Sequence, residues 1–318
     1  MRFDAPISDE TNEFHIRDAD EANFRRIWWR PAAPSTASMK KSPSLDLIHR
    51  MVGAFEGADI LFFANSKEFT DVLLVETARL AGIGRIIMDL PNTDPHPEIS
   101  PDIVVAPSRA TLRETSVKRL AGAKMVIYPG ADLDRFAIAQ NVRLPPRCVI
   151  GFVARLEPEK SAGLFIDMVT KLHTTACDFV IVGDGSMFSS LRMLARKLGV
   201  QHKIHFTGML HGDALPFMMA RMYVIVNPST SETETFCIVN IEAMALGIPL
   251  VSFGAGGVSD YLEHGVNGIL VDEVSGHGLA RGVQLALKMR DVLSIGARKT
   301  ARKFSLASMT AKYLAFVE

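Results

Sequence analysis

Short apolar runs alternate with helical segments along most of this 318-residue chain, and this alternation restricts the possible folds more than any other feature. Runs such as 60–64 (ILFFA), 103–106 (IVVA) and 148–153 (CVIGFV) have the composition of buried strands. The segments between them repeat their apolar residues at about every 3.6 positions, as helices packed on a sheet do. Strands that alternate with helices predict an α/β protein with parallel sheets and helices on both faces.

The predicted elements form two groups, separated by a proline-rich break at residues 143–147 (RLPPR). The sequence predicts strands at 60–64, 85–90, 103–106, 125–128, 148–153, 179–182, 203–206, 222–226, 249–253 and 269–271. It predicts helices at 45–55, 67–80, 108–113, 161–173, 191–198, 238–245 and near 259–264, and two more at the end of the chain. Two such groups predict two Rossmann-like, doubly wound domains.

The predicted domain organisation has four parts. Residues 1–44 are charged and then rich in Pro and Ser, so we expect an irregular or partly disordered lead-in, with Trp28 and Trp29 in a packing role. A shortened amino-terminal Rossmann-like domain would span 45–138, and a carboxy-terminal one 139–300. A closing helix at 301–318 would pack back on the first domain.

Composition excludes several classes of function. Lys and Arg total 35, as do Asp and Glu, so the basic excess of a nucleic-acid-binding protein is missing. The three cysteines form no CxxC pair, which suits a reducing compartment. No apolar run reaches the roughly 18 residues of a membrane span, and the first residues lack an apolar signal core. We therefore expect a cytoplasmic protein, with peripheral membrane contact left open.

Arg155 and Lys160 lie in a turn between a predicted strand and a predicted helix. Two cations beside the positive end of a helix dipole, near unpaired backbone amides, are suited to a diphosphate. The competing interpretation is a solvated loop, with a salt bridge to Glu157 or Glu159. From these residues alone, both interpretations remain open.

Glu234 and Glu242 form the second candidate pair, at the start of a predicted helix and inside it. Glu242 lies between Ile241 and Ala243, and burying a carboxylate there is costly unless it has partners. A ribose diol would supply two hydrogen bonds to it. Glu234 has a simpler alternative role, because a negative charge near a helix N-terminus is favourable in any protein.

Two glycine clusters follow predicted strands, at 183–185 and 254–257. Phe188 and Ser259 stand where a dinucleotide fingerprint needs its third glycine, so a nicotinamide-dependent oxidoreductase is disfavoured. Tight turns with close backbone approach to a ligand explain both clusters better. The histidines show no HExxH or HxH spacing, and the chain lacks a P-loop, so we expect neither a metal nor a cofactor.

Several segments together resemble the group 1 class of retaining glycosyltransferases with the GT-B fold. They are, in chain order, 127–136 (IYPGADLDRF), 151–161 (GFVARLEPEKS), 180–187 (VIVGDGSM) and 227–271, which holds PS, E-x7-E, EAMA-x-G-x-P and GG. The resemblance implies a retaining enzyme that needs no metal and transfers a sugar from a nucleotide-diphosphate sugar to an unknown acceptor. The first domain would be the acceptor side.

The resemblance also implies a role for each matching residue. Arg155 and Lys160 would hold the diphosphate and stabilise the leaving group, and Glu234 would contact the transferred sugar. Glu242 would bind the ribose. The remaining residues implied in nucleotide-sugar binding, through the backbone amides in particular, are Thr235, Phe236, Cys237 and Ile238.

The chain departs from the family pattern at several positions. Thr235 and Cys237 stand where glycine is frequent, and Asp260 replaces a glutamate. The opening strand and Gly-rich loop of the first domain are not recognisable, and His96 is only a weak candidate for the cleft histidine, a plain turn being the alternative. A second hypothesis therefore remains: a non-catalytic or fragmentary GT-B protein that acts as a partner subunit or scaffold.

Overall fold

The computed structural model of the chain describes residues 7–9, 12–18, 25–31, 45–65, 69–91, 95–172, 176–232 and 234–316. By its internal contacts the chain divides into two compact units whose segments interleave. The smaller unit comprises Met1–Asp89, Pro95–Val104 and Leu120–Ala123, and the larger unit comprises Leu90–Asp94, Val105–Arg119 and Lys124–Glu318. Residues 105–119 and 124–138 thus group with the carboxy-terminal half, so the contacts do not divide the chain at residue 139. The predicted domain boundaries remain predictions.

The first strands of the chain correct one prediction. Strands β1 (Ile7–Asp9), β2 (Asn12–Asp18) and β3 (Arg25–Pro31) form an antiparallel sheet, where the sequence suggested an irregular lead-in. The overlooked signal is the alternation of apolar Phe14 and Ile16 with polar residues, which is the pattern of a strand. In the β2–β3 register, Phe14 pairs with Trp29 and Ile16 with Ile27. The Pro- and Ser-rich stretch 32–44 lies outside the described residues.

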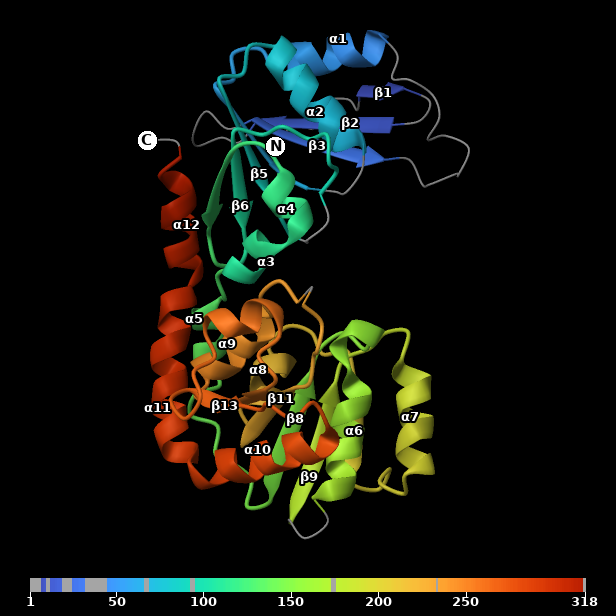
Figure 1. The fold of residues 1–318 in the computed structure, drawn as a ribbon, viewed down its shortest axis with the longest axis vertical. Helices are drawn as coiled ribbons and strands as arrows, with labels where there is room; N and C mark the ends of the chain where they lie inside the picture. Colours follow the sequence, from blue (N-terminus) through green and yellow to red (C-terminus); the bar gives the residue numbers. More distant parts are fainter. Residues whose placement is uncertain are drawn as a thin grey trace. The chain divides into compact units, whose positions relative to one another are not determined.

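A second sheet has the strand order β4-β5-β6-β7. Its strands are β4 (Ile60–Ala64), β5 (Arg85–Asp89), β6 (Ile103–Ala106) and β7 (Ala123–Val126). The helices of this part of the chain are α1 (Leu45–Ala54), α2 (Phe69–Leu80), α3 (Arg109–Arg113) and α4 (Thr115–Arg119). The β4–β5 pair is parallel, as the alternation of strands and helices predicts (Figure 1).

The larger unit is built on a six-stranded parallel sheet with the order β10-β9-β8-β11-β12-β13. Its strands are β8 (Cys148–Val153), β9 (Cys177–Val182), β10 (Ile204–Gly208), β11 (Val224–Asn227), β12 (Leu250–Ser252) and β13 (Gly268–Leu270). Its longer helices are α6 (Ala162–Lys171), α7 (Phe188–Lys197), α9 (Ile238–Ala245), α10 (Gly276–Lys288), α11 (Arg290–Ala301) and α12 (Leu306–Leu314). Numbered along the chain, the strand order is 3-2-1-4-5-6, the order of a Rossmann sheet.

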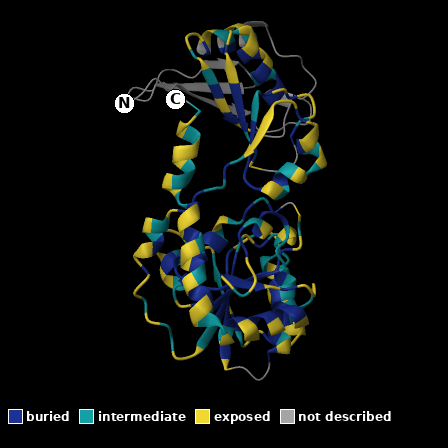
Figure 2. Ribbon diagram, turned by 60° about the vertical axis from the view of Figure 1, so that its left-hand side comes forward, coloured by how far each residue is buried: buried dark blue, intermediate teal, exposed yellow. Residues whose placement is uncertain are grey.

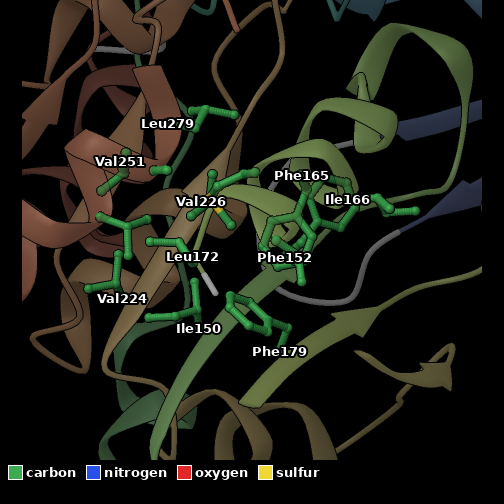
Figure 3. Close-up of a cluster of buried hydrophobic side chains, with 14 of the residues drawn as sticks. Ile150, Phe152, Phe165, Ile166, Leu172, Phe179, Val224, Val226, Val251 and Leu279 are labelled. Carbon is green, nitrogen blue, oxygen red and sulfur yellow. The ribbon is translucent and has the colours of Figure 1, made fainter. Parts of the chain in front are cut away.

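Two apolar clusters pack in the larger unit. One contains Phe152 and Phe179 of the sheet together with Phe165 and Ile166 of α6 (Figure 3). The other cluster includes Phe136, Phe236, Met244, Tyr261 and Phe304. In Figure 2 the strands of this unit are mostly buried, while the helices alternate buried and exposed residues. This distribution is expected of a sheet whose two faces are both covered.

The remaining differences from prediction concern short elements. A 3₁₀ turn at Gly256–Asp260 replaces the helix predicted near 259–264, and three helices rather than two close the chain. The unpredicted α5 (Leu133–Ala137) and α8 (Ala214–Met219) have only five and six residues, too few to show a helical period. Within the described ranges, no helix combines the length and apolarity needed to cross a membrane.

Candidate functional site

The strand order of the larger sheet reverses between β8 and β11. Within this sheet, β8 is the first strand in sequence order and β11 is the fourth. In open parallel sheets the connections on either side of such a reversal diverge, which leaves a crevice beyond the carboxyl ends of the strands. The loop after β8 carries Arg155 and Lys160, and the segment after β11 carries Glu234. Topology therefore brings the two sequence-predicted groups to the same place.

The loop after β8 is held by the glycine turn at 183–185. The Leu156 N–H donates to the Asp184 carbonyl at 2.9 Å, and the Met187 N–H donates to the Leu156 carbonyl at 2.8 Å. A Cβ at Gly183 would lie 1.9 Å from the Ala154 carbonyl oxygen, and Gly183 has φ +140°. The tight turn is as predicted, but the backbone that Gly183 approaches is the protein's own loop. The close approach to a ligand stays a prediction.

Lys160 ends a 3₁₀ turn at Pro158–Lys160 and makes the central contact of the site. Its Nζ donates to Glu234 Oε2 at 2.5 Å, across 74 residues of sequence. The Lys160 side chain is 17% exposed and that of Glu234 only 7%, so the ion pair is largely withdrawn from water. Ser229 supports this turn, because its hydroxyl donates to the Glu159 carbonyl at 3.0 Å.

Arg155 lies in a different environment from Lys160. Its side chain is 68% exposed, and its guanidinium Nη2 lies 3.6 Å from Glu159 Oε1. This is the solvated ion pair that the competing interpretation described. The other proposed partner, Glu157, instead accepts hydrogen bonds from the Ser186 hydroxyl and backbone amide, which lower the pKa of the Glu157 carboxyl.

The second glycine cluster supports the segment that carries Glu234. The Gly257 N–H donates to the Glu234 carbonyl at 2.7 Å. A Cβ at Gly257 would lie 1.9 Å from the Thr235 carbonyl oxygen, and one at Gly256 2.3 Å from the Glu234 carbonyl oxygen. Only glycine allows this approach, so the GG pair holds residues 234–235 in place. Thr235 itself is half-buried.

Cys237 precedes helix α9 in the left-handed conformation, with φ +65°. Its Sγ accepts a hydrogen bond from Asn227 Nδ2 at 3.3 Å, so the side chain is engaged within the protein. Burial, with a further contribution from the Glu234 carboxylate, raises the pKa of the Cys237 thiol to about 12. The thiol is therefore protonated at neutral pH and unsuited to act as a nucleophile.

The amino terminus of α9 has no side-chain cap, because Cys237 makes no capping hydrogen bond. Orphan N–H groups and the helix dipole make such an end favourable for an anion. Ile238, the first residue of α9, is 38% exposed. Phe236 is buried, with its ring 5.1 Å from that of Tyr261 and 5.4 Å from that of Phe304, so its side chain belongs to the core.

Glu242 lies one turn further along α9 and is half-buried. Burial raises the pKa of its carboxyl above the ordinary value, and the Arg135 guanidinium partly opposes that rise. Arg135 lies on α5 and donates to the Gly212 carbonyl at 2.6 Å. Sequence reasoning missed the role of Arg135, because nothing in its local sequence points to Glu242, which lies 107 positions later (135 to 242).

Sequence reasoning also missed the hydrogen bonds that fix the start of α9. The Tyr261 hydroxyl donates to the Phe236 carbonyl at 2.8 Å and accepts from Asn240 Nδ2 at 2.8 Å. Asp260, which stands where the family has glutamate, accepts from the Arg109 N–H at 2.6 Å. Tyr261 directly follows the 3₁₀ turn at Gly256–Asp260, and the need of a buried tyrosine hydroxyl for a hydrogen-bond partner was the signal for the first of these contacts.

The remaining candidates give no further site. His96 belongs to the smaller unit and lies in a turn, where its Nδ1 accepts from the Glu98 N–H at 3.3 Å. Among the residues that the structure describes, no group of three or more His, Cys, Asp or Glu side chains is arranged to hold a metal ion.

Solved structures show the same fold. A crystal structure of HepE from Anabaena in complex with UDP superposes with a TM-score of 0.73, at 22% identity, over 86% of this chain and 82% of that one. Sucrose-phosphate synthase from Thermosynechococcus elongatus gives a TM-score of 0.69, at 18% identity, over 86% of this chain and 77% of that one. The fold class is therefore GT-B, as the sequence predicted.

The chain belongs to the family described as glycosyl transferases group 1, whose model matches residues 134–305. An uncharacterized glycosyltransferase of Methanocaldococcus jannaschii is 38% identical over 140 residues, which are 44% of this chain and only 35% of that protein. A GDP-mannose-dependent alpha-(1-6)-phosphatidylinositol monomannoside mannosyltransferase of Mycobacterium tuberculosis is 27% identical over 88% of this chain and 80% of its own length. The family prediction is confirmed.

Proposed function

We propose that the protein transfers a sugar, with retention of anomeric configuration, from a nucleotide-diphosphate sugar to an acceptor. The observation that carries the proposal is the Lys160–Glu234 ion pair beside the uncapped amino terminus of α9. A cation, a carboxylate and the amino terminus of a helix then converge where the strand order reverses. Each has a counterpart in such a donor: the diphosphate, the sugar hydroxyls and the phosphate oxygens.

Lys160 and Arg155 are proposed to neutralise the diphosphate as the bond to the sugar breaks. Negative charge develops on the leaving phosphate, and donors placed in advance stabilise it without reorganisation. Lys160 is the stronger candidate, because it is largely withdrawn from water and held in place. Removal of one such donor typically lowers kcat about 10²–10³-fold. Because these cations do the work of a metal, we expect the reaction to need no metal cofactor.

Glu242 and Glu234 are proposed to recognise the hydroxyl groups of the donor. Glu242 resists ionisation in its half-buried position, so two ribose hydroxyls that donate to its carboxylate would offset this cost. For Glu234, a bound diphosphate would compete for Lys160 and free a carboxylate oxygen for the transferred sugar. The backbone of residues 235–238 would line the sugar and phosphate.

The relatives support a nucleotide-sugar donor without selecting its base. HepE was crystallised with UDP, whereas the Mycobacterium relative is named as GDP-mannose-dependent. We assign the acceptor to the smaller unit, because the larger unit supplies every residue of the proposed donor site.

A donor panel with uridine, guanosine and adenosine diphosphate sugars tests the proposal by thermal shift and calorimetry. A donor at a hundredfold excess over its Kd stabilises the folded state by about 2.7 kcal/mol. Glu242→Ala is expected to abolish that shift, while Glu263→Ala, at an exposed position, is a matched control and should retain it. A wild-type protein that binds no donor, or a full shift in Glu242→Ala, would overturn the assignment.

Turnover and stereochemistry need a separate measurement. When water serves as the acceptor, the protein should hydrolyse an α-linked donor, and NMR should show that the sugar is first released as the α anomer. EDTA should not change the rate of this hydrolysis. The β anomer would contradict retention, and a rate lost to EDTA would contradict the metal-free proposal. Binding without turnover in any acceptor screen would instead favour the partner-subunit hypothesis.

A further inference from the structure

A pocket of about 450 Å³ lies in the larger unit, away from the proposed donor site. Its lining includes residues 139–140, 142–144, Met222 and Ile248, which precede strands β8, β11 and β12. The donor-site residues instead follow the carboxyl ends of β8 and β11. Because these strands are parallel, the pocket and the donor site lie at opposite edges of the sheet. A six-residue strand such as β8 separates the two edges by roughly 20 Å.

The pocket combines positive charge with a smaller amount of exposed apolar surface. Three arginines line it, Arg143, Arg290 and Arg298, and its lining contains no Asp or Glu. The other lining residues are mostly apolar in type, and of these Val142 and Leu144 are half-buried and so partly exposed. Three guanidinium groups that share one pocket without a carboxylate repel one another, so an anion there would be stabilised.

The three arginines retain capacity to bind an anion. Arg298 donates to Ser294 Oγ and to the Leu246 carbonyl, both at 3.1 Å, which directs its guanidinium without neutralising it. Arg290 packs over the Tyr223 ring at 5.3 Å, and its Nη1 lies 4.0 Å from the fully exposed Asp291 carboxylate. A screened contact of that length compensates little charge.

Arg290, which lines the pocket, carries one unusual atom. Among the described residues, Arg290 Nε is the one buried side-chain nitrogen or oxygen without a hydrogen-bond partner. A buried donor without a partner costs about 1–3 kcal/mol, so native proteins seldom leave one unmatched. An anionic oxygen would supply that acceptor once the Arg290 side chain turns toward the pocket, because Nε itself is closed to solvent in this structure.

We propose that this pocket binds a small organic phosphate: the dianionic phosphate contacts the guanidinium groups, and the organic part packs on Val142 and Leu144. Guanidinium forks match phosphate oxygens in geometry and charge. The volume is in the range of small-molecule sites and larger than a phosphate ion needs. This inference does not depend on the proposed function, since it uses a different set of residues.

Isothermal titration with phenyl phosphate tests the proposal in the full chain, with inorganic phosphate and phenol as the partial ligands. Phenyl phosphate should bind more tightly than either. The Arg143→Gln variant should weaken its binding about tenfold or more, as expected when a charged hydrogen bond is lost. Arg143 is exposed, so this variant should keep the melting temperature of the wild type, whereas Arg290→Gln also changes a packed side chain.

Lys160→Ala separates this pocket from the donor site. Phenyl phosphate should bind Lys160→Ala as it binds the wild type, since Lys160 does not line the pocket. Three results would each overturn the proposal: no binding at millimolar concentration, binding lost in Lys160→Ala, or binding unchanged in Arg143→Gln. Loss of binding in Lys160→Ala would place phenyl phosphate at the donor site instead, whereas the Glu242→Ala experiment tests donor binding on its own.

Discussion

The Lys160→Met substitution tests whether the ion pair at the centre of the site is truly shielded from water. It removes the ammonium group and keeps most of the aliphatic chain. The Glu234 carboxylate, 7% exposed, then loses the partner at 2.5 Å. Breaking a buried pair from one side costs about 3–5 kcal/mol. Because 17% of the Lys160 side chain is exposed, we expect the free energy of unfolding to fall by the lower limit of this range, about 3 kcal/mol. For a domain of this size, that corresponds to a fall in Tm of roughly 6–12 °C.

Arg155→Met is the matched control, because it makes the same chemical change in a 68% exposed side chain whose partner lies 3.6 Å away. It should change the free energy of unfolding by less than about 1 kcal/mol. Urea unfolding at pH 7 measures both variants. In a double-mutant cycle, Glu234→Gln should recover part of the stability that Lys160→Met loses, because a buried amide tolerates the missing cation better. Equal losses in the two methionine variants, or additive effects in the cycle, would refute this reasoning.

Three other changes have defined outcomes. Gly257→Ala, whose Cβ would lie 1.9 Å from the Thr235 carbonyl oxygen, should destabilise the larger unit by roughly 1–3 kcal/mol in urea unfolding, and unchanged stability would contradict the close approach. Tyr261→Phe removes the hydroxyl that donates to the Phe236 carbonyl, so it should cost about 1–3 kcal/mol; a neutral effect would show that the carbonyl finds another donor. Glu242→Gln tests a pH dependence. Because the folded pKa of Glu242 is raised, this residue makes the unfolding free energy fall as pH rises from its unfolded pKa of about 4.3 through the folded value. Unfolding curves across that range should therefore show the variant gaining stability over the wild type as pH rises, and a constant difference would refute the raised pKa.

The sequence predicted most of the fold of the larger unit. Its strands are continuous apolar runs, and its helices have a regular apolar period, so local patterns sufficed. Prediction was weaker where elements are short, as in α5 and α8, or where charged residues hide an alternating strand, as in β2. The 3₁₀ turn at Gly256–Asp260 depends on its approach to residues 234–235, a tertiary contact without local signal.

For the site, the sequence by itself determined which residues are chemically suitable, and their spacing matched one family. It could not distinguish Arg155 from Lys160, two cations five positions apart in one turn. Only the tertiary structure did so, by pairing Lys160 with a buried carboxylate 74 residues away and leaving Arg155 exposed. Charge and spacing are local properties of a sequence, whereas burial depends on which distant segments the fold brings together. Burial therefore decides how strongly each charge acts.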